Sequence, residues 1–75
     1  MRMEDLAHGV RRLRQDDTLM EILRIIKHDA IQIFENPNSD PERILEAHSS
    51  IQAIGTLIRA FDAVEADDRI KKKEQ

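Results

Sequence analysis

Asn36-Pro37-Asn38-Ser39-Asp40-Pro41 contains both prolines of the 75-residue chain and separates two long stretches in which apolar residues recur with helical spacing. Prolines and asparagines clustered in this way are typical of a tight connection. The position before Pro37 disfavours helical geometry, whereas Asp40 and Pro41 suit the N-cap and the first residue of a new helix. The segment therefore predicts the turn of an antiparallel helical hairpin.

The pattern before this turn predicts a helix over residues 18–35. Thr18 and Glu21 fit a capping box, and two aspartates just upstream favour the positive end of the helix dipole. Apolar residues recur at intervals of four and three, which keeps them on one face of a helix. This stripe consists of Leu19, Leu23, Ile26, Ala30 and Ile33.

The pattern after the turn predicts a longer helix over residues 41–68. Its apolar residues follow a/d spacing for almost three heptads, and we call them the main seam: Ile44, Ala47, Ile51, Ile54, Ile58 and Phe61. At 1.5 Å per residue this helix measures about 42 Å, against about 27 Å for the first. The far end of the longer helix therefore extends beyond its hairpin partner.

Residues 3–14 are expected to pack against that end as a short amphipathic helix. The a/d spacing of their apolar residues predicts this helix: Met3, Leu6, Val10 and Leu13. The last residues, 69–75, are nearly all charged, so we expect them to form a disordered tail. The sequence contains no repeat or glycine-rich linker, which predicts a single helical domain over residues 1–68.

Composition supports an all-α class. Hydrophobic residues make up 40% of the chain, charged residues 36% and aromatic residues 3%, a balance typical of helical bundles and unlike that of β-sandwiches. Without cysteine, neither disulfides nor thiolate chemistry is available. The segment MRMEDLAHGV lacks the apolar core of a secretory signal, and no apolar run is long enough to span a bilayer. We expect a cytoplasmic protein that makes no membrane contact.

Self-association is predicted because a hairpin of this size has little core of its own and both apolar stripes are wide. A homo-oligomeric helical bundle, with a dimer favoured, would cover their edges. Gly55 lies beside the main seam, where glycine costs about 1 kcal/mol relative to alanine, so we expect the backbone of another helix to approach it closely. The predicted interface comprises Leu19, Leu23, Ile26, Ile33, Ile44, Ile51, Ile54, Gly55, Ile58 and Phe61.

Catalytic and metal-binding patterns are missing from the sequence. The di-metal motif of helical bundles needs a glutamate three residues before a histidine, but Ile25 precedes His28 and Leu45 precedes His48 at that spacing. His48 and Ser49 are adjacent, so on a helix they diverge and do not form a nucleophile and base. We therefore expect no enzyme activity, no catalytic residues, no cofactor and no metal.

The function that remains is a non-enzymatic interaction or assembly module of accessory or regulatory type, which has a protein partner. The alternative is a small nucleic-acid-associated regulator, because residues 1–14 and 69–75 carry charges of +2 and +3 around a body of −8. In that reading Arg11, Arg12 and Arg14 form an arm that contacts phosphate. The acidic body and the shortage of stacking aromatics make nucleic acid the less favoured partner.

Overall fold

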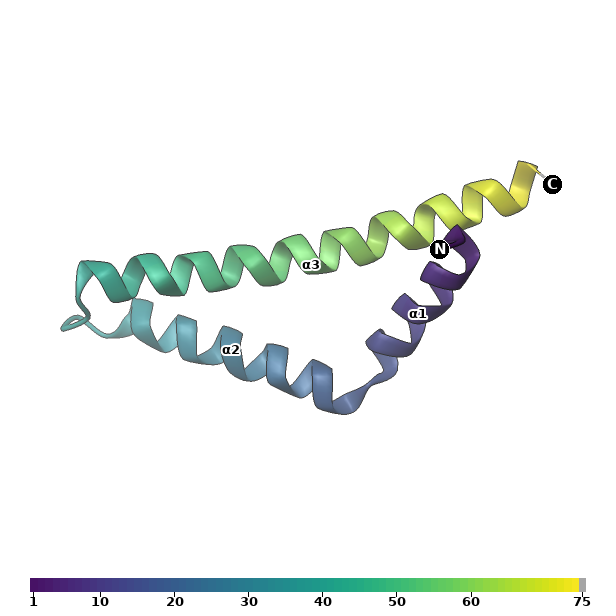
Figure 1. Cartoon of the computed structure of the whole chain (residues 1–75). Coiled ribbons are helices and arrows are strands. Elements are labelled where there is room, and N and C mark those ends of the chain that lie inside the picture. The colour runs from purple at the N-terminus through teal and green to yellow at the C-terminus, as the bar shows by residue number, and fades with distance from the viewer. Residues whose placement is uncertain (75) are drawn as a thin grey trace.

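The computed structural model describes residues 1–74 and contains three helices and no strands within them. These are α1 (Met3–Gln15), α2 (Asp17–Glu35) and α3 (Pro41–Glu74), shown in Figure 1. The all-α prediction is confirmed, and the bounds predicted for the first two helices agree with the structure to within one residue. No helix in this part of the chain is long and apolar enough to span a membrane.

A single residue, Asp16, separates α1 from α2. Its backbone N–H donates to the carbonyl of Leu13 at 3.1 Å and closes α1, while its carboxylate accepts the N–H of Leu19 at 3.0 Å and caps α2. The cap of α2 is therefore Asp16, and the capping box predicted at Thr18 was wrong. The extended backbone of Asp16, with φ −78° and ψ 106°, turns the chain sharply between the two helices.

Polar side chains close the connection between α2 and α3. The side-chain oxygen of Asn36 accepts the N–H of Asn38 at 2.9 Å, which is the local turn that asparagine favours. Ser39 donates its hydroxyl to the carbonyl of Ile33 at 2.8 Å, so one of the last carbonyls of α2 has a partner. The helix that follows begins at Pro41, as predicted from its suitability for the first helical position.

Helix α3 extends beyond its predicted end at residue 68 and reaches Glu74. Residues 69–74 are thus helical, whereas the sequence predicted a disordered tail there; Gln75 lies outside the described residues. Lys72 reaches Asp68 one turn earlier at 3.3 Å, and the lysines of the last turn complement the negative end of the helix dipole. The positions of the charges along this segment, and not their number, therefore favour a helix.

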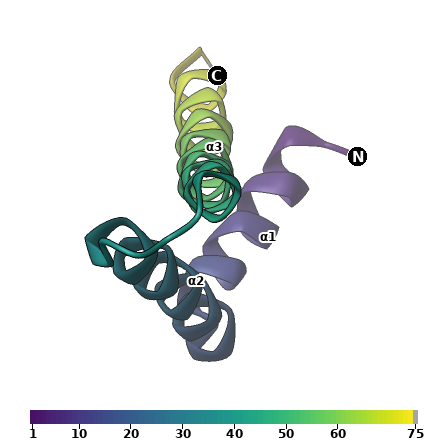
Figure 2. The ribbon, with the colours of Figure 1, turned by 90° about the vertical axis from the view of Figure 1, so that its left-hand side faces the viewer.

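The two shorter helices cover different parts of α3. Helix α2 contacts the N-terminal half of α3, approaches it most closely near the turn and diverges toward its own N-terminus (Figure 1). Helix α1 crosses the C-terminal half, and the view along α3 places α1 and α2 on different sides of it (Figure 2). Together the three helices outline a triangle of which α3 is the longest side.

The face through which α1 packs includes Val10 of the predicted stripe but is shifted toward Ala7. Its buried residues are Ala7 and Val10, while Leu6 and Leu13 of the predicted stripe remain 38% and 44% exposed. The side of α1 that faces α3 also carries Arg11, whose carboxylate partner lies on α3. Pairing of this charge turns the helix, and part of its apolar stripe consequently faces solvent.

The core of the folded chain is small. Only five apolar residues are buried within residues 1–74, and three of them are alanines: Ala7, Val10, Ala30, Ala47 and Phe61. The radius of gyration is 16.3 Å, whereas a compact domain of this length has a value of about 11 Å. The chain is therefore extended, and one copy leaves much of its apolar surface uncovered.

The space around Gly55 shows whether another helix of the same chain approaches α3 at this position. A Cβ atom added there would lie 3.3 Å from Nη1 of Arg59, the flexible end of a side chain, and it would meet no other helix of the same chain within 4 Å. The predicted close approach of a backbone is therefore absent within one copy. We expect Gly55→Ala to stabilise the protein by up to about 1 kcal/mol, because alanine favours helix and the arginine can move aside.

Thermal unfolding followed by circular dichroism measures this effect. Gly9→Ala is the matched control, since a Cβ at Gly9 would meet nothing within 4 Å. Both variants should unfold at higher temperature than the unchanged chain. A lower melting temperature for the Gly55 variant alone would show that a second molecule packs against Gly55.

Candidate functional site

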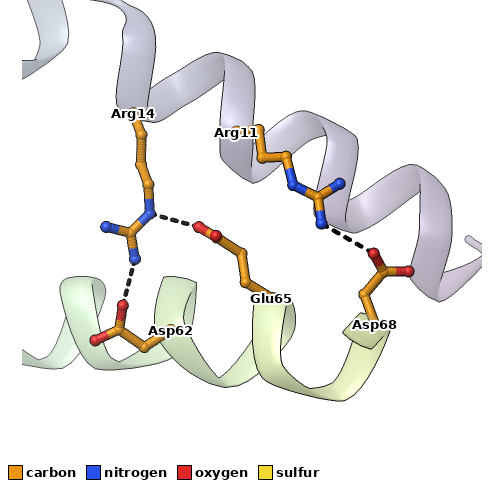
Figure 3. A network of polar contacts seen from close by, with 5 residues as sticks. All are labelled: Arg11, Arg14, Asp62, Glu65 and Asp68. Atoms are coloured by element: carbon orange, nitrogen blue, oxygen red, sulfur yellow. Dashed lines mark hydrogen bonds and ion pairs between the residues drawn. The ribbon is translucent and has the colours of Figure 1, made fainter. Parts of the chain in front are cut away.

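An ionic cluster joins α1 to α3. Arg14 donates from Nη2 to Oδ1 of Asp62 at 2.6 Å, and its Nε lies 2.6 Å from Oε1 of Glu65. Arg11 donates from Nη2 to Oδ2 of Asp68 at 3.0 Å. Figure 3 shows the two guanidinium groups of α1 directed at three carboxylates of α3 that are spaced three residues apart.

Asp68 is the most enclosed member of this cluster and is 2% exposed. The hydrogen bond from Arg11 holds the pKa of its carboxyl below the ordinary range; burial opposes that shift, and Lys72, on the same helix, reinforces it. A buried carboxylate is costly unless it is paired. The two cations, one from each helix, therefore allow Asp68 to stay ionised inside the contact.

The acidic residues of the cluster continue the register of the main seam. Glu65 and Asp68 follow Phe61 at intervals of four and three, so they occupy the next two a/d positions of α3. The seam is apolar where α3 faces α2 and becomes acidic after Phe61, where it faces α1. Sequence reasoning ended the seam at Glu65 because it required apolar side chains. The continued spacing was the signal that could have located the α1 contact.

The three arginines expected to form a nucleic-acid arm differ in their surroundings. Arg11 and Arg14 are half-buried and pair with carboxylates of α3, and Arg14 also lies over the ring of Phe61, 5.4 Å from its centre. Arg12 is exposed. Two of the three guanidinium groups are thus engaged within the chain.

Two apolar hollows border α3 on one side. The first, of about 280 Å³, lies between α2 and α3. The second, of about 330 Å³, lies between α1 and α3. The first is lined by Leu23, Ile26, Ser50, Ala53, Ile54 and Leu57, and the second mainly by Leu6, Val10, Leu13, Ala60, Phe61 and Val64.

The hollows share a second stripe of α3, distinct from the main seam. Its members recur at intervals of three and four, which places them on one face of the helix: Ser50, Ala53, Leu57, Ala60 and Val64. All five are exposed or half-buried. We call this stripe, together with the two hollows beside it, the α3 groove.

The predicted interface residues are divided between the contact inside the chain and its surface. Phe61 is buried; Ile26 and Ile44 are 39% and 38% exposed. The others are half-buried: Leu19, Leu23, Ile33, Ile51, Ile54, Gly55 and Ile58. The structure of one copy brings most of them together between α2 and α3, and their role between copies stays a prediction.

Further large apolar side chains reach solvent around the molecule. Ile22 is 49% exposed and Leu45 is 65% exposed. Ile25, Ile31, Phe34 and Ile70 also have more than a third of their surface accessible. This apolar surface is the dominant chemical feature of the described chain. The histidines are all exposed, and no three histidine or carboxylate side chains among residues 1–74 lie together as metal ligands would.

No protein-family model matches this chain, and neither a curated protein nor a solved structure is significantly similar to it. The site is therefore interpreted from its geometry and chemistry.

Asp68 makes the α1–α3 contact sensitive to pH. Because pairing lowers its pKa in the folded state, it stabilises that state fully above the ordinary aspartate pKa of about 3.9, and this contribution is lost as pH falls through the lowered value. We expect Asp68→Asn to lower the melting temperature at pH 7 by a few degrees. The difference from the unchanged protein should disappear at strongly acidic pH.

Melting curves from pH 7 to 2 measure this dependence. Asp67→Asn removes the neighbouring exposed carboxylate and serves as the control, with little expected effect at any pH. A constant difference between Asp68→Asn and the unchanged protein across the whole range would contradict an ionised, stabilising Asp68.

Proposed function

We propose that the chain is a non-enzymatic assembly module that joins further copies of itself through apolar helix faces. In this proposal α2 and α3 act as a hairpin within an oligomeric helical bundle, and α1 covers the end of α3. The observation that carries the proposal is the accessible surface of one copy, 6002 Å². A compact monomer of 8.7 kDa exposes about 4,700 Å².

The excess of about 1,300 Å² is comparable with what an interface buries. Standard interfaces bury about 800 Å² on each partner, and obligate homodimers bury more. Large aliphatic side chains on several faces of the helices contribute to this exposed surface, and extensive apolar surface of this kind marks interaction sites. A second copy is the partner that supplies a matching apolar surface without any other molecule, so we favour a dimer.

An accessory role with a further protein partner fits the side chains that lie away from the α3 groove. Leu45 and Ile70, near opposite ends of α3, are 65% and 56% exposed. The hollows support binding rather than catalysis, because aliphatic side chains dominate their linings. Catalytic pockets need several converging polar groups.

The alternative, a nucleic-acid-associated regulator, has one observation in its favour. The two basic ends meet, since Arg2 lines the same hollow of about 450 Å³ as Lys71 and Lys72. Glu4 and Asp68 line that hollow too and reduce its attraction for phosphate. Internal pairing of Arg11 and Arg14 also counts against an arm.

Light scattering after size exclusion at micromolar concentration tests self-association. We expect about twice the mass of the 8.7 kDa chain, together with a melting temperature that rises with protein concentration. A folded, strictly monomeric species whose melting temperature is independent of concentration would exclude the proposal.

Electrophoretic mobility shift in rising salt tests the alternative. Arg12→Ala is the informative variant, because Arg12 is exposed and its loss leaves the α1–α3 contact intact. We expect no duplex binding at physiological salt. Binding that weakens in Arg12→Ala, with a shallower salt dependence, would support the regulator instead. Arg24→Ala, in which an exposed arginine is removed from α2, controls for total charge.

A further inference from the structure

We infer that a second copy of the chain lies antiparallel along the α3 groove, with a two-fold axis passing beside Leu57. This inference rests on the proposed self-association and specifies its face, direction and register.

The stripe of α3 is nearly symmetric about its central leucine. Ser50 and Val64 lie one heptad before and after Leu57, and Ala53 and Ala60 are almost equidistant from it. In a two-fold dimer a patch contacts the same patch of the other copy. A stripe that is symmetric about Leu57 therefore pairs with its copy when the two Leu57 side chains lie opposite each other. Alanine then faces alanine on either side of the axis. Small residues there allow two helix backbones to approach closely.

Antiparallel pairing also brings unlike hollows together. The hollow between α2 and α3 borders the stripe before Leu57, and the hollow between α1 and α3 borders it after Ala60. The two-fold axis places the first hollow of one copy against the second hollow of the other. Ile26 of α2 would then cover Leu13 of the partner's α1, and each of these side chains is about 40% exposed in one copy.

The charges in the two terminal turns of α3 favour the antiparallel direction over the parallel one. The first turn of α3 carries Glu42, and its last turn carries Lys71, Lys72 and Lys73. Glu42 and Lys71 are nearly equidistant from Leu57, so antiparallel pairing places opposite charges together at both ends. Parallel pairing would instead bring the lysine cluster against its own copy, and like charges repel.

Cysteine substitution tests the register directly, because the chain contains no cysteine of its own. Leu57→Cys places one thiol at the axis, opposite its copy and within the 4.4–6.8 Å between Cα atoms that a disulfide spans. Under mild oxidation we expect it to form a covalent dimer at least an order of magnitude faster than Arg59→Cys. Arg59 is the matched control, since it is exposed and lies on the opposite side of α3.

Ala53→Cys and Ala60→Cys determine the direction of the helices. In the antiparallel register two copies of Ala53 are about 12 Å apart along the axis, too far to form a disulfide. Ala53→Cys alone should therefore stay uncrosslinked, while an equal mixture with Ala60→Cys should form the mixed dimer. These alanine variants keep Leu57 intact, and circular dichroism confirms that each remains helical.

The outcomes separate this inference from the proposal beneath it. Efficient crosslinking of Ala53→Cys alone would show parallel pairing and overturn the inference. Crosslinking at Gly55→Cys, on another face of α3, with none at Leu57→Cys, would show self-association through that face and also overturn it. A monomeric mass by light scattering for the unchanged protein would reject the proposed function itself.

Discussion

The contact between two arginines of α1 and three carboxylates of α3 determines the arrangement of the whole chain. Asp68 is nearly inaccessible to water. A carboxylate in that position is costly unless a cation pairs with it. Arg11 comes from α1 and Lys72 from α3. Helix α1 therefore contacts α3 through ion pairs as well as through Ala7 and Val10, while Leu6 and Leu13 remain partly exposed.

A single copy cannot enclose α3 on every side. Helix α3 has 34 residues, while α1 and α2 have 13 and 19, and each of these covers a different half and side of it. The faces that neither reaches contain aliphatic side chains at helical spacing. One copy leaves these side chains accessible, and the proposed self-association rests on that exposure.

Much of the fold could be predicted from the sequence. Prolines and a/d spacing located both longer helices and the start of α3 at Pro41, since these signals act within a few residues. The errors arose where distant residues decide the outcome. Leu6 and Leu13 were expected to face α3, but the carboxylates that fix the rotation of α1 lie more than 40 residues away in sequence. Spacing within one helix carries no information about such partners.

Two other differences have local causes. The helical extension to Glu74 escaped prediction because a count of charges ignores their order, and Lys72 lies one turn after Asp68. Gly55 was assigned to a helix crossing because glycine is costly within a helix, yet only the end of Arg59 lies near it in one copy. The full extent of the α3 groove was missed because Ser50, Ala53 and Ala60 do not resemble a seam until the hollows on either side are known.

The connection between Arg11 and Asp68 also has a consequence for how the chain folds. These residues are 57 positions apart, so their contact closes nearly the whole polypeptide into a loop, and the entropy of that closure is lost before the pair can form. Contacts between α2 and α3 near the turn close much shorter loops and form first. We therefore expect helix α1 to dock last and to open first, with amide hydrogens that exchange with solvent faster than those beside the turn.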